Sequence, residues 1–262
     1  MIIADIDLDI FLSEVSSFDH RPRAPSSVHP WSEAQVRHFL EEQCQLSRDR
    51  TSKRPKGYFI VHHDEAFPIF EALSRNGATP LTVAHIDAHS DFGTGFGDQS
   101  WIDIGQRVLG FDPERRVKAI PRSGPERISP ANYLSFALAC RWIASLTYVH
   151  HAQSGHDLMP FFFRSFDTEC EMVELRHIPH GLFDAVTAGS KDKLIALPHV
   201  LEPPILFRKV AVEDYRALAP FDYVILCQSP GYTPTEADAL IPIFEEYVDF
   251  EVRFHETIGK QT

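Results

Sequence analysis

The sequence predicts an α/β fold, a three-layer αβα sandwich built on a mainly parallel β-sheet. Short apolar segments alternate with segments of helical periodicity along the chain, and this alternation is typical of a parallel sheet covered by helices on both faces. The length of 262 residues suits one α/β domain. We therefore expect residues 1–262 to form a single domain.

The predicted strands are short apolar runs, and the first and third of them end in acidic residues or histidines. Runs of this length and composition, separated by helical segments, indicate buried strands. The expected strands cover residues 1–6, 58–61, 81–86, 146–149, 170–175, 193–197, 222–227 and 250–254.

The predicted helices follow these strands. The first begins at Ser32, which fits a capping box with Gln35, and Val36, Phe39 and Leu40 supply its apolar stripe. Further helices are expected over residues 65–75, 132–144 and 234–247, whereas residues 115–130 are expected to form a charged, proline-containing loop.

Composition excludes several classes of protein. The formal net charge is −12 and no basic domain stands out, which argues against nucleic acid as a partner. No apolar run approaches the roughly 20 residues of a membrane span, and the N-terminus does not resemble a secretory signal. The four cysteines are widely spaced, without a C-x-x-C pair, so we expect free thiols and a cytoplasmic protein.

Three segments at expected strand ends carry residues that bind metals. Residues 5–9 alternate acids with apolar residues, and period two places Asp5, Asp7 and Asp9 on one face of an extended segment. Residues 87–91 repeat the pattern with Asp87, His89 and Asp91, and residues 61–65 contain His62 and His63. Because sites in parallel sheets form beyond the carboxyl ends of the strands, these segments are expected to converge.

The charges in such a cluster predict metal ions. Four carboxylates meeting in one cleft would repel one another, and buried unpaired acids are costly. Two divalent cations would neutralise them. An oxygen-rich set with two imidazoles and no thiolate suits Mn²⁺ better than structural Zn²⁺.

These motifs resemble those of the arginase and agmatinase superfamily. Residues 87–91, Asp-Ala-His-Ser-Asp, are similar to its D-A-H-x-D signature, residues 5–9 to its S-x-D-x-D element, and residues 61–66 to its single-histidine element. The likeness is closest to the branch that includes the peptide arginases, which convert arginine to ornithine in ribosomally made peptides. The segments that suggest this branch are residues 62–66, 85–89, 101–105, 202–203 and 229–234.

The sequence departs from the superfamily pattern in two ways. In ordinary arginases the S-x-D-x-D element follows D-A-H-x-D in the chain, whereas here it is N-terminal, as if the strand order were permuted. In addition, Asp5 stands where that element has its serine.

The resemblance implies an arginase-like fold that holds two Mn²⁺ ions. His63 is preferred to His62 as a ligand because it directly precedes the Asp-Glu-Ala that opens a helix. One ion would be held by His63, Asp87, Asp91 and Asp7, and the other by His89, Asp87, Asp7 and Asp9, with Asp7 and Asp87 bridging.

The implied reaction is Mn²⁺-dependent hydrolysis of the guanidino group of arginine in a precursor peptide. A hydroxide bridging the two ions would attack the guanidinium carbon, giving ornithine and urea. Asp91 would relay a proton to the leaving amine. A further carboxylate should bind the guanidinium, with Glu202 as the first candidate and Glu65 as the second. A homo-oligomer is also implied by the resemblance.

Other functions remain open. The same dimetal site could hydrolyse free arginine, agmatine or another C–N substrate, or the chain could be a non-catalytic metal-containing protein that binds a peptide. The N-terminal D-x-D is also similar to that of haloacid-dehalogenase phosphatases, but this hypothesis lacks a later Asp-Asp pair and leaves residues 87–91 unexplained. A turn at residues 229–231 is expected to shape the rim of the pocket.

Overall fold

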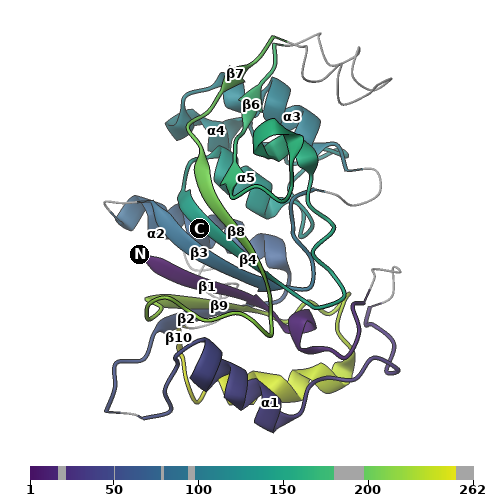
Figure 1. Cartoon of the computed structure of the whole chain (residues 1–262), viewed down its shortest axis with the longest axis vertical. Coiled ribbons are helices and arrows are strands. Elements are labelled where there is room, and N and C mark those ends of the chain that lie inside the picture. Colours follow the sequence, from purple (N-terminus) through teal and green to yellow (C-terminus); the bar gives the residue numbers. More distant parts are fainter. Residues whose placement is uncertain (17–21, 50, 78–79, 94–97, 180–197, 252–262) are drawn as a thin grey trace, which may run out of the picture.

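The computed structural model is built on an eight-stranded sheet and describes residues 1–16, 22–49, 51–77, 80–93, 98–179 and 198–251. The strand order is β10-β2-β9-β1-β3-β4-β8-β5 (Figure 1). Every neighbouring pair is parallel except β5 with β8. The predicted α/β class and mainly parallel sheet are therefore confirmed.

The elements have the following bounds. The strands are β1 (Ile2–Asp7), β2 (Lys56–Ile60), β3 (Leu81–Asp87), β4 (Ile143–His150), β5 (Met172–Val173), β6 (Arg176–His177), β7 (Val200–Leu201), β8 (Ile205–Ala211), β9 (Tyr223–Cys227) and β10 (Asp249–Glu251). The α-helices are α1 (Glu33–His38), α2 (Ala66–Asn76), α3 (Ser100–Gln106), α4 (Pro113–Ala119), α5 (Tyr133–Ala139) and α7 (Ile241–Phe244). Short 3₁₀ helices include η1 (Leu8–Phe11), η3 (His63–Glu65) and η8 (Thr235–Leu240), and a π-helical turn, η2 (Phe39–Gln43), extends α1.

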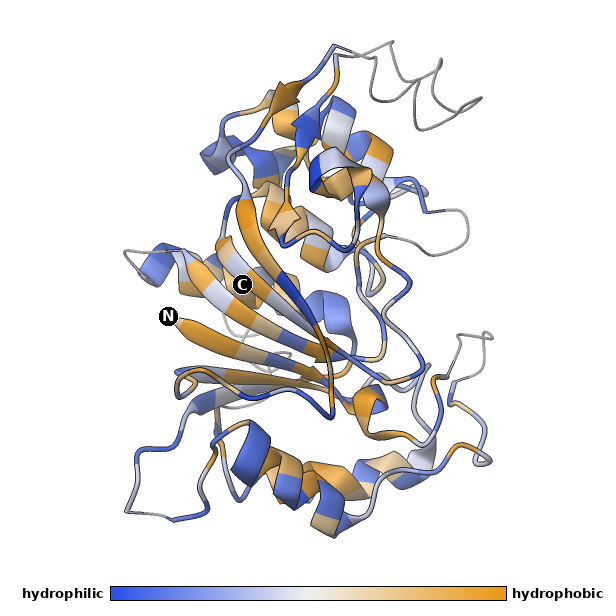
Figure 2. Ribbon diagram, viewed as in Figure 1, coloured by the Kyte–Doolittle hydropathy of each residue, from blue (hydrophilic) through white to orange (hydrophobic). Residues whose placement is uncertain are grey.

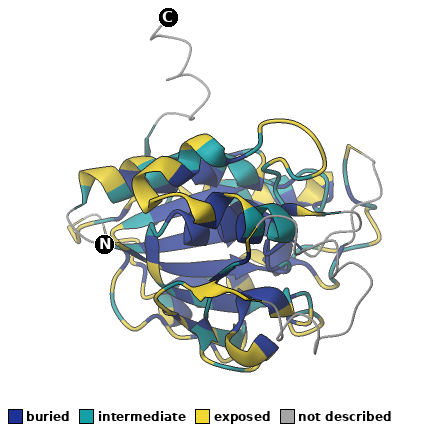
Figure 3. Ribbon diagram, turned by 90° about the horizontal axis from the view of Figure 1, so that it is seen from above, coloured by how far each residue is buried: buried dark blue, intermediate teal, exposed yellow. Residues whose placement is uncertain are grey.

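Two hydrophobic cores lie on opposite faces of the sheet. Alternate residues of β1 enter them: Ile3 packs in the core that contains residues of α2 and α5, whereas Ala4 and Ile6 pack in the core that contains residues of α1 and α7. The strands are buried between the helical layers (Figure 3), which gives the expected three layers. Figure 2 shows that β1 is hydrophobic except for acids near its arrowhead.

The predicted start of the first helix is confirmed. Ser32 and Gln35 form a reciprocal capping box, in which the Ser32 side chain accepts from the Gln35 amide and the Gln35 side chain accepts from the Ser32 amide. Most strand predictions are also confirmed within a few residues. The predicted strand over residues 193–197 lies outside the described residues, and so does the end of the one over 250–254.

Three predictions are corrected. The helix expected over residues 132–144 ends at Ala139, because Arg141 adopts a left-handed φ of 62° and β4 begins at Ile143. Part of the loop expected over residues 115–130 is α4, which begins with Pro113 in its first turn. The helix expected over residues 234–247 is 3₁₀ in its first part, η8, and α-helical only in α7. Strand β8 and helix α3 were not predicted.

The order of strands places four carboxyl ends at one edge of the sheet. Strand β1 lies between β9 and β3, and β2 lies beyond β9. Asp5 pairs in register with His85 of β3, and Asp7 pairs with Cys227 of β9. The segments after β1, β2 and β3, which carry the expected ligands, therefore meet at this edge. Among the described helices, none is long and apolar enough to cross a membrane.

Candidate metal centre

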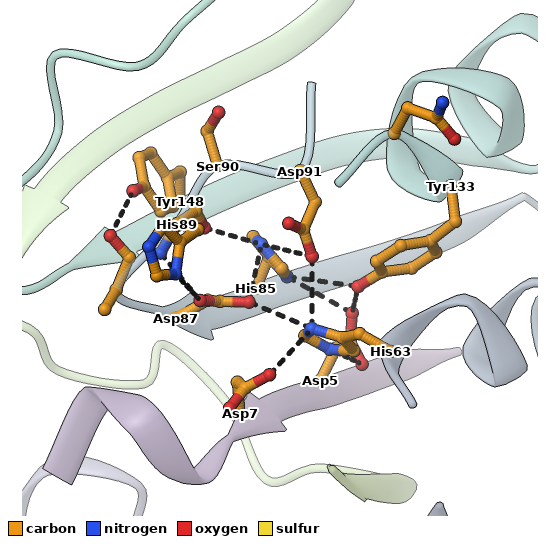
Figure 4. A network of polar contacts seen from close by, with 12 residues as sticks. Asp5, Asp7, His63, His85, Asp87, His89, Ser90, Asp91, Tyr133 and Tyr148 are labelled. Carbon is orange, nitrogen blue, oxygen red and sulfur yellow. Dashed lines mark hydrogen bonds and ion pairs between the residues drawn. The ribbon is translucent and has the colours of Figure 1, made fainter. Parts of the chain in front are cut away.

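The structure brings all six expected metal ligands together at the carboxyl edge of the sheet. Figure 4 labels all of them except Asp9. They line one small cavity together with Pro130, Ser229 and Tyr232. The six are Asp7, Asp9, His63, Asp87, His89 and Asp91.

His63 forms the first half of the cluster. Its Nδ1 atom lies 2.9 Å from Asp87 Oδ2, 3.1 Å from Asp91 Oδ2 and 3.2 Å from Asp7 Oδ2. The side chain is only 2% exposed. Nevertheless, neither His63 Nδ1 nor Asp91 Oδ2 has a hydrogen-bond partner in the part of the chain that the structure describes. His62, by contrast, is exposed and lies outside the cluster. Of these two neighbouring histidines, His63 is therefore the one at the candidate site.

Asp9, Asp87 and His89 form the second half. His89 Nδ1 lies 2.8 Å from Asp9 Oδ2, and Asp87 Oδ1 accepts a 2.7 Å hydrogen bond from the His89 amide. Asp87 belongs to both halves, as a bridging ligand must. Asp7 faces His63 through Oδ2, while its Oδ1 accepts from the Asp9 amide at 2.9 Å; its bridging role stays a prediction.

The segment from Asp5 to Asp9 is not extended throughout, which corrects the period-two interpretation. β1 ends at Asp7, whose side chain caps the 3₁₀ helix η1, and Asp9 is in the first turn of that helix. Asp9 still reaches the cavity because the helix turns the chain across the end of β3: its Oδ1 accepts from the Ala88 amide at 3.1 Å.

Asp157, which lies outside the motif of residues 87–91, fixes the turn after β3. Asp91 has a left-handed φ of 54°, a conformation that Asp tolerates better than most residues. The Ser90 amide donates to Asp157 Oδ2, and the Ser90 hydroxyl donates to the Asp157 carbonyl, both at 2.6 Å. Sequence reasoning missed Asp157, because no motif surrounds it.

A buried polar network stands behind the cluster. Asp5 is completely buried, and its carboxylate contacts His63 Nε2 at 3.2 Å, His85 Nδ1 at 3.2 Å and the Tyr133 hydroxyl at 2.5 Å. His85 and Tyr133 were not predicted as site residues. The only sequence signal was the position of His85 two residues before Asp87, which places both on the same face of β3.

The buried carboxylates of the cluster repel one another, and positive charge would stabilise them. Burial raises the pKa of Asp87 well above its usual value, and the charges of Asp9, Asp91 and Asp7 raise it further. Burial and Asp9 likewise raise the pKa of Asp7. Burial also opposes ionisation of Asp9, but the hydrogen bond and the charge of His89 lower the pKa of that carboxyl. Divalent cations would relieve this repulsion.

The residues therefore fit metal ions. The donor set is carboxylate and imidazole, with the Cys227 thiol beside Asp7 and His63. His63 Nδ1 and Asp91 Oδ2 are buried and lie 3.1 Å apart without a hydrogen bond in the described structure. Asp87 is shared between two groups of three donors. Hard or borderline divalent ions such as Mn²⁺ prefer this set.

Two of the three residues expected to act in catalysis, Glu65 and Glu202, are not among the residues that line the cavity. Asp91 lines the cavity. Glu65 Oε1 accepts a 3.2 Å hydrogen bond from the His62 amide and completes a capping box at η3. Glu202 forms a two-pronged ion pair with Arg116, at 2.7 and 3.0 Å. The structure thus shows local structural contacts for Glu202 and Glu65, and their binding of a substrate guanidinium stays a prediction.

A cleft of about 440 Å³ opens above the cluster. It shares His63, Pro130, Ser229 and Tyr232 with the cavity lined by the six candidate ligands, and the Tyr232 ring lies 4.7 Å from that of His89. The turn at residues 229–231 lines the cleft, as expected. The described lining of the cleft includes Arg127 and holds no carboxylate.

Comparison with known proteins adds no assignment. No protein-family model matches the chain, and neither the curated proteins nor the solved structures contain a match.

Proposed function

We propose that this chain is a dinuclear, Mn²⁺-dependent hydrolase that converts arginine side chains of a ribosomally made peptide to ornithine, releasing urea. The observation that carries the proposal is the cluster itself, in which two groups of donors, all buried except the partly exposed His89, share Asp87 and lie at the base of an open cleft. The motif resemblance supplies the reaction class.

Water is added across a C–N bond in this reaction. The chemistry that bound divalent ions supply is a water of lowered pKa, and therefore hydroxide near neutral pH. Hydroxide would add to the guanidinium carbon, the bond from that carbon to the side-chain nitrogen would break, and this nitrogen would take up a proton as the ornithine amine leaves. Asp91 lines the cavity and Oδ2 is buried, so its carboxylate is the group proposed to carry that proton.

The cleft supports a substrate larger than a free amino acid. Its volume of about 440 Å³ falls within the range of small-molecule sites, which is roughly 300–1,000 Å³, and this would admit an arginine side chain with part of its backbone. All four cysteines are free, which supports the proposed cytoplasmic location. An arginine-containing precursor peptide is the proposed partner, with neither nucleic acid nor membrane required.

Mass spectrometry tests the proposal. Arginine-containing peptides are incubated with Mn²⁺-loaded protein, and Asp87→Ala serves as the matched control because it removes the shared ligand. Each modified arginine should lose about 42 Da, the mass of CN₂H₂, and the loss should disappear in the variant. If peptides with and without a leader segment, free arginine and agmatine all stay intact, the proposal fails.

The lining of the cleft favours a second candidate. A guanidinium is best matched by a carboxylate, yet the described lining outside the metal cluster holds only a cation, Arg127, and neutral or histidine side chains. We therefore propose an acylated amine as the alternative C–N substrate of the same site. Release of the free amine from acylated peptides, with arginine peptides intact, would favour this candidate.

A further inference from the structure

The two halves of the candidate centre are supported unequally. The ring of His63 is anchored by a carboxylate that is not among the proposed ligands, whereas the ring of His89 is hydrogen-bonded to a proposed ligand. We propose that Asp5 is a positioning residue that fixes His63 for metal binding, so that the metal position at His63 holds its ion more tightly than the position at His89. This inference rests on the metal centre of the proposed function but not on its substrate.

Asp5 fixes which nitrogen of His63 faces the metal position. An ionised carboxylate only accepts hydrogen bonds, so a contact of 3.2 Å from His63 Nε2 to Asp5 Oδ1 assigns the ring hydrogen to Nε2. In the neutral ring, which is the form that binds a metal, the lone pair is then on Nδ1, the atom that faces Asp7, Asp87 and Asp91 at 2.9 to 3.2 Å. A carboxylate that orients a histidine in this way also makes it a better ligand.

Three elements hold Asp5 in place. It lies in β1, His85 of β3 contacts its Oδ2 at 3.2 Å, and the hydroxyl of Tyr133 from α5 donates to the same oxygen at 2.5 Å. The rings of Tyr133 and His85 also pack near His63, with centroids 4.9 and 5.3 Å away. Asp5, His85 and Tyr133 are completely buried. His63 therefore has little freedom to leave the orientation that an ion requires.

The half of the centre around His89 is less preorganised for a metal ion. His89 lies in the turn after β3, and its side chain is 28% exposed. Its Nδ1 atom already pairs with Asp9 Oδ2 at 2.8 Å, so an ion that uses both groups must replace this bond. At His63 the corresponding Nδ1 atom is buried and lies 2.9 to 3.2 Å from Asp7, Asp87 and Asp91 without a hydrogen bond among the described residues, so an ion bound between these groups leaves the ring in the orientation that Asp5 holds.

Titration with Mn²⁺ in the absence of substrate tests the inference. Electron paramagnetic resonance of free Mn²⁺ gives the number and affinity of the bound ions, and the wild-type chain should show a tight class and a weaker class. Asp5→Asn keeps the size of the side chain but removes its charge. We expect it to weaken the tight class by roughly 10- to 100-fold and to leave the weak class nearly unchanged. Tyr133→Phe, which removes one hydroxyl, should weaken the same class by a smaller factor.

Asp222→Asn is the matched control. Asp222 Oδ2 accepts a 2.8 Å hydrogen bond from the Ile2 amide at the opposite end of β1, so this substitution changes a carboxylate that supports the same strand far from the cluster. Its metal affinities should equal those of the wild type. If Asp5→Asn does not fold, the Tyr133→Phe titration decides.

Three results overturn the inference: equal affinities for both ions in the wild type, equal weakening of both classes in the variants, or a lower melting temperature with unchanged affinities. A wild type that binds no ion overturns the proposed function as well. If two ions bind unequally and Asp5→Asn weakens only the tight class, but no substrate is hydrolysed, the inference stands and the proposed reaction fails.

Discussion

His89 is a proposed ligand for which proton and metal compete above neutral pH. Burial opposes its charge, but the hydrogen bond and the charge of Asp9 raise the pKa of His89 to about 9. A metal ion can bind only after this proton leaves. We predict that the affinity of the weaker Mn²⁺ class rises with pH between 7 and 9, by up to about tenfold per unit. Titrations at three pH values measure this, and a flat profile would contradict it.

The same proton affects the metal-free protein in the opposite direction. The pKa of His89 in the folded state lies above the value of about 6.5 expected in the unfolded chain. Its pairing with Asp9 therefore stabilises the fold fully below about pH 6.5, and this contribution is lost as the pH rises through about 9. The melting temperature of the chelator-treated protein should fall over this interval, and His89→Gln should flatten the fall.

Sequence alone could identify single members of the cluster but not their supports. The alternation of acids and histidines at strand ends marked the segments, the resemblance selected the six residues, and the position of His63 before a helix separated it from His62. The support from Tyr133 could not be predicted, because it reaches Asp5 from a helix 128 positions away in the chain. Nothing near residue 133 marks it as polar support.

An ion pair between Arg116 and Glu202 ties helix α4 to the segment that contains Glu202. The Arg116 guanidinium is almost fully buried and also donates to the carbonyls of Ala139 and Phe111. Removing one partner of a buried ion pair leaves the other charge unpaired. We predict that Glu202→Ala lowers the free energy of unfolding by about 2–3 kcal/mol, slightly less than for a fully buried pair, since Glu202 is partly exposed.

Chemical denaturation measures the effect, and Mn²⁺ titration of the same variant separates the two roles considered for Glu202. A structural residue leaves the metal affinities and the turnover of the folded variant unchanged. Normal stability with lost turnover would instead return Glu202 to substrate binding.

Elements encoded by adjacent residues were predicted better than elements that depend on contacts with residues far away in the chain. The apolar strands and the capping box at Ser32 are encoded in adjacent residues, and both are observed. Residues 115–119 were expected to belong to a charged loop, yet they lie in a helix whose Arg116 is neutralised by a residue 86 positions away. The helix over residues 132–144 was drawn too long because its apolar run continues into β4.

For the whole molecule, the proposed metal centre among buried carboxylates predicts that stability depends on metal. Ligands that bind only the folded state stabilise it, by about 2.7 kcal/mol at a hundredfold excess over the Kd. We predict that a chelator lowers the melting temperature, that Mn²⁺ restores it, and that Asp87→Ala is insensitive to both. Calorimetry measures the three states. An unchanged melting temperature in the wild type would mean that the acids are accommodated without an ion.

The strand order also sets when the centre can be assembled. All six proposed ligands are present once residue 91 has been synthesised, and β1 pairs directly with β3. The strand that delivers His63, however, pairs in the described sheet only with β9 and β10, which are translated more than 130 residues later. On the ribosome, the half of the centre around Asp9 and His89 can form early. The half around His63 must wait until β9 is inserted between strands made long before it.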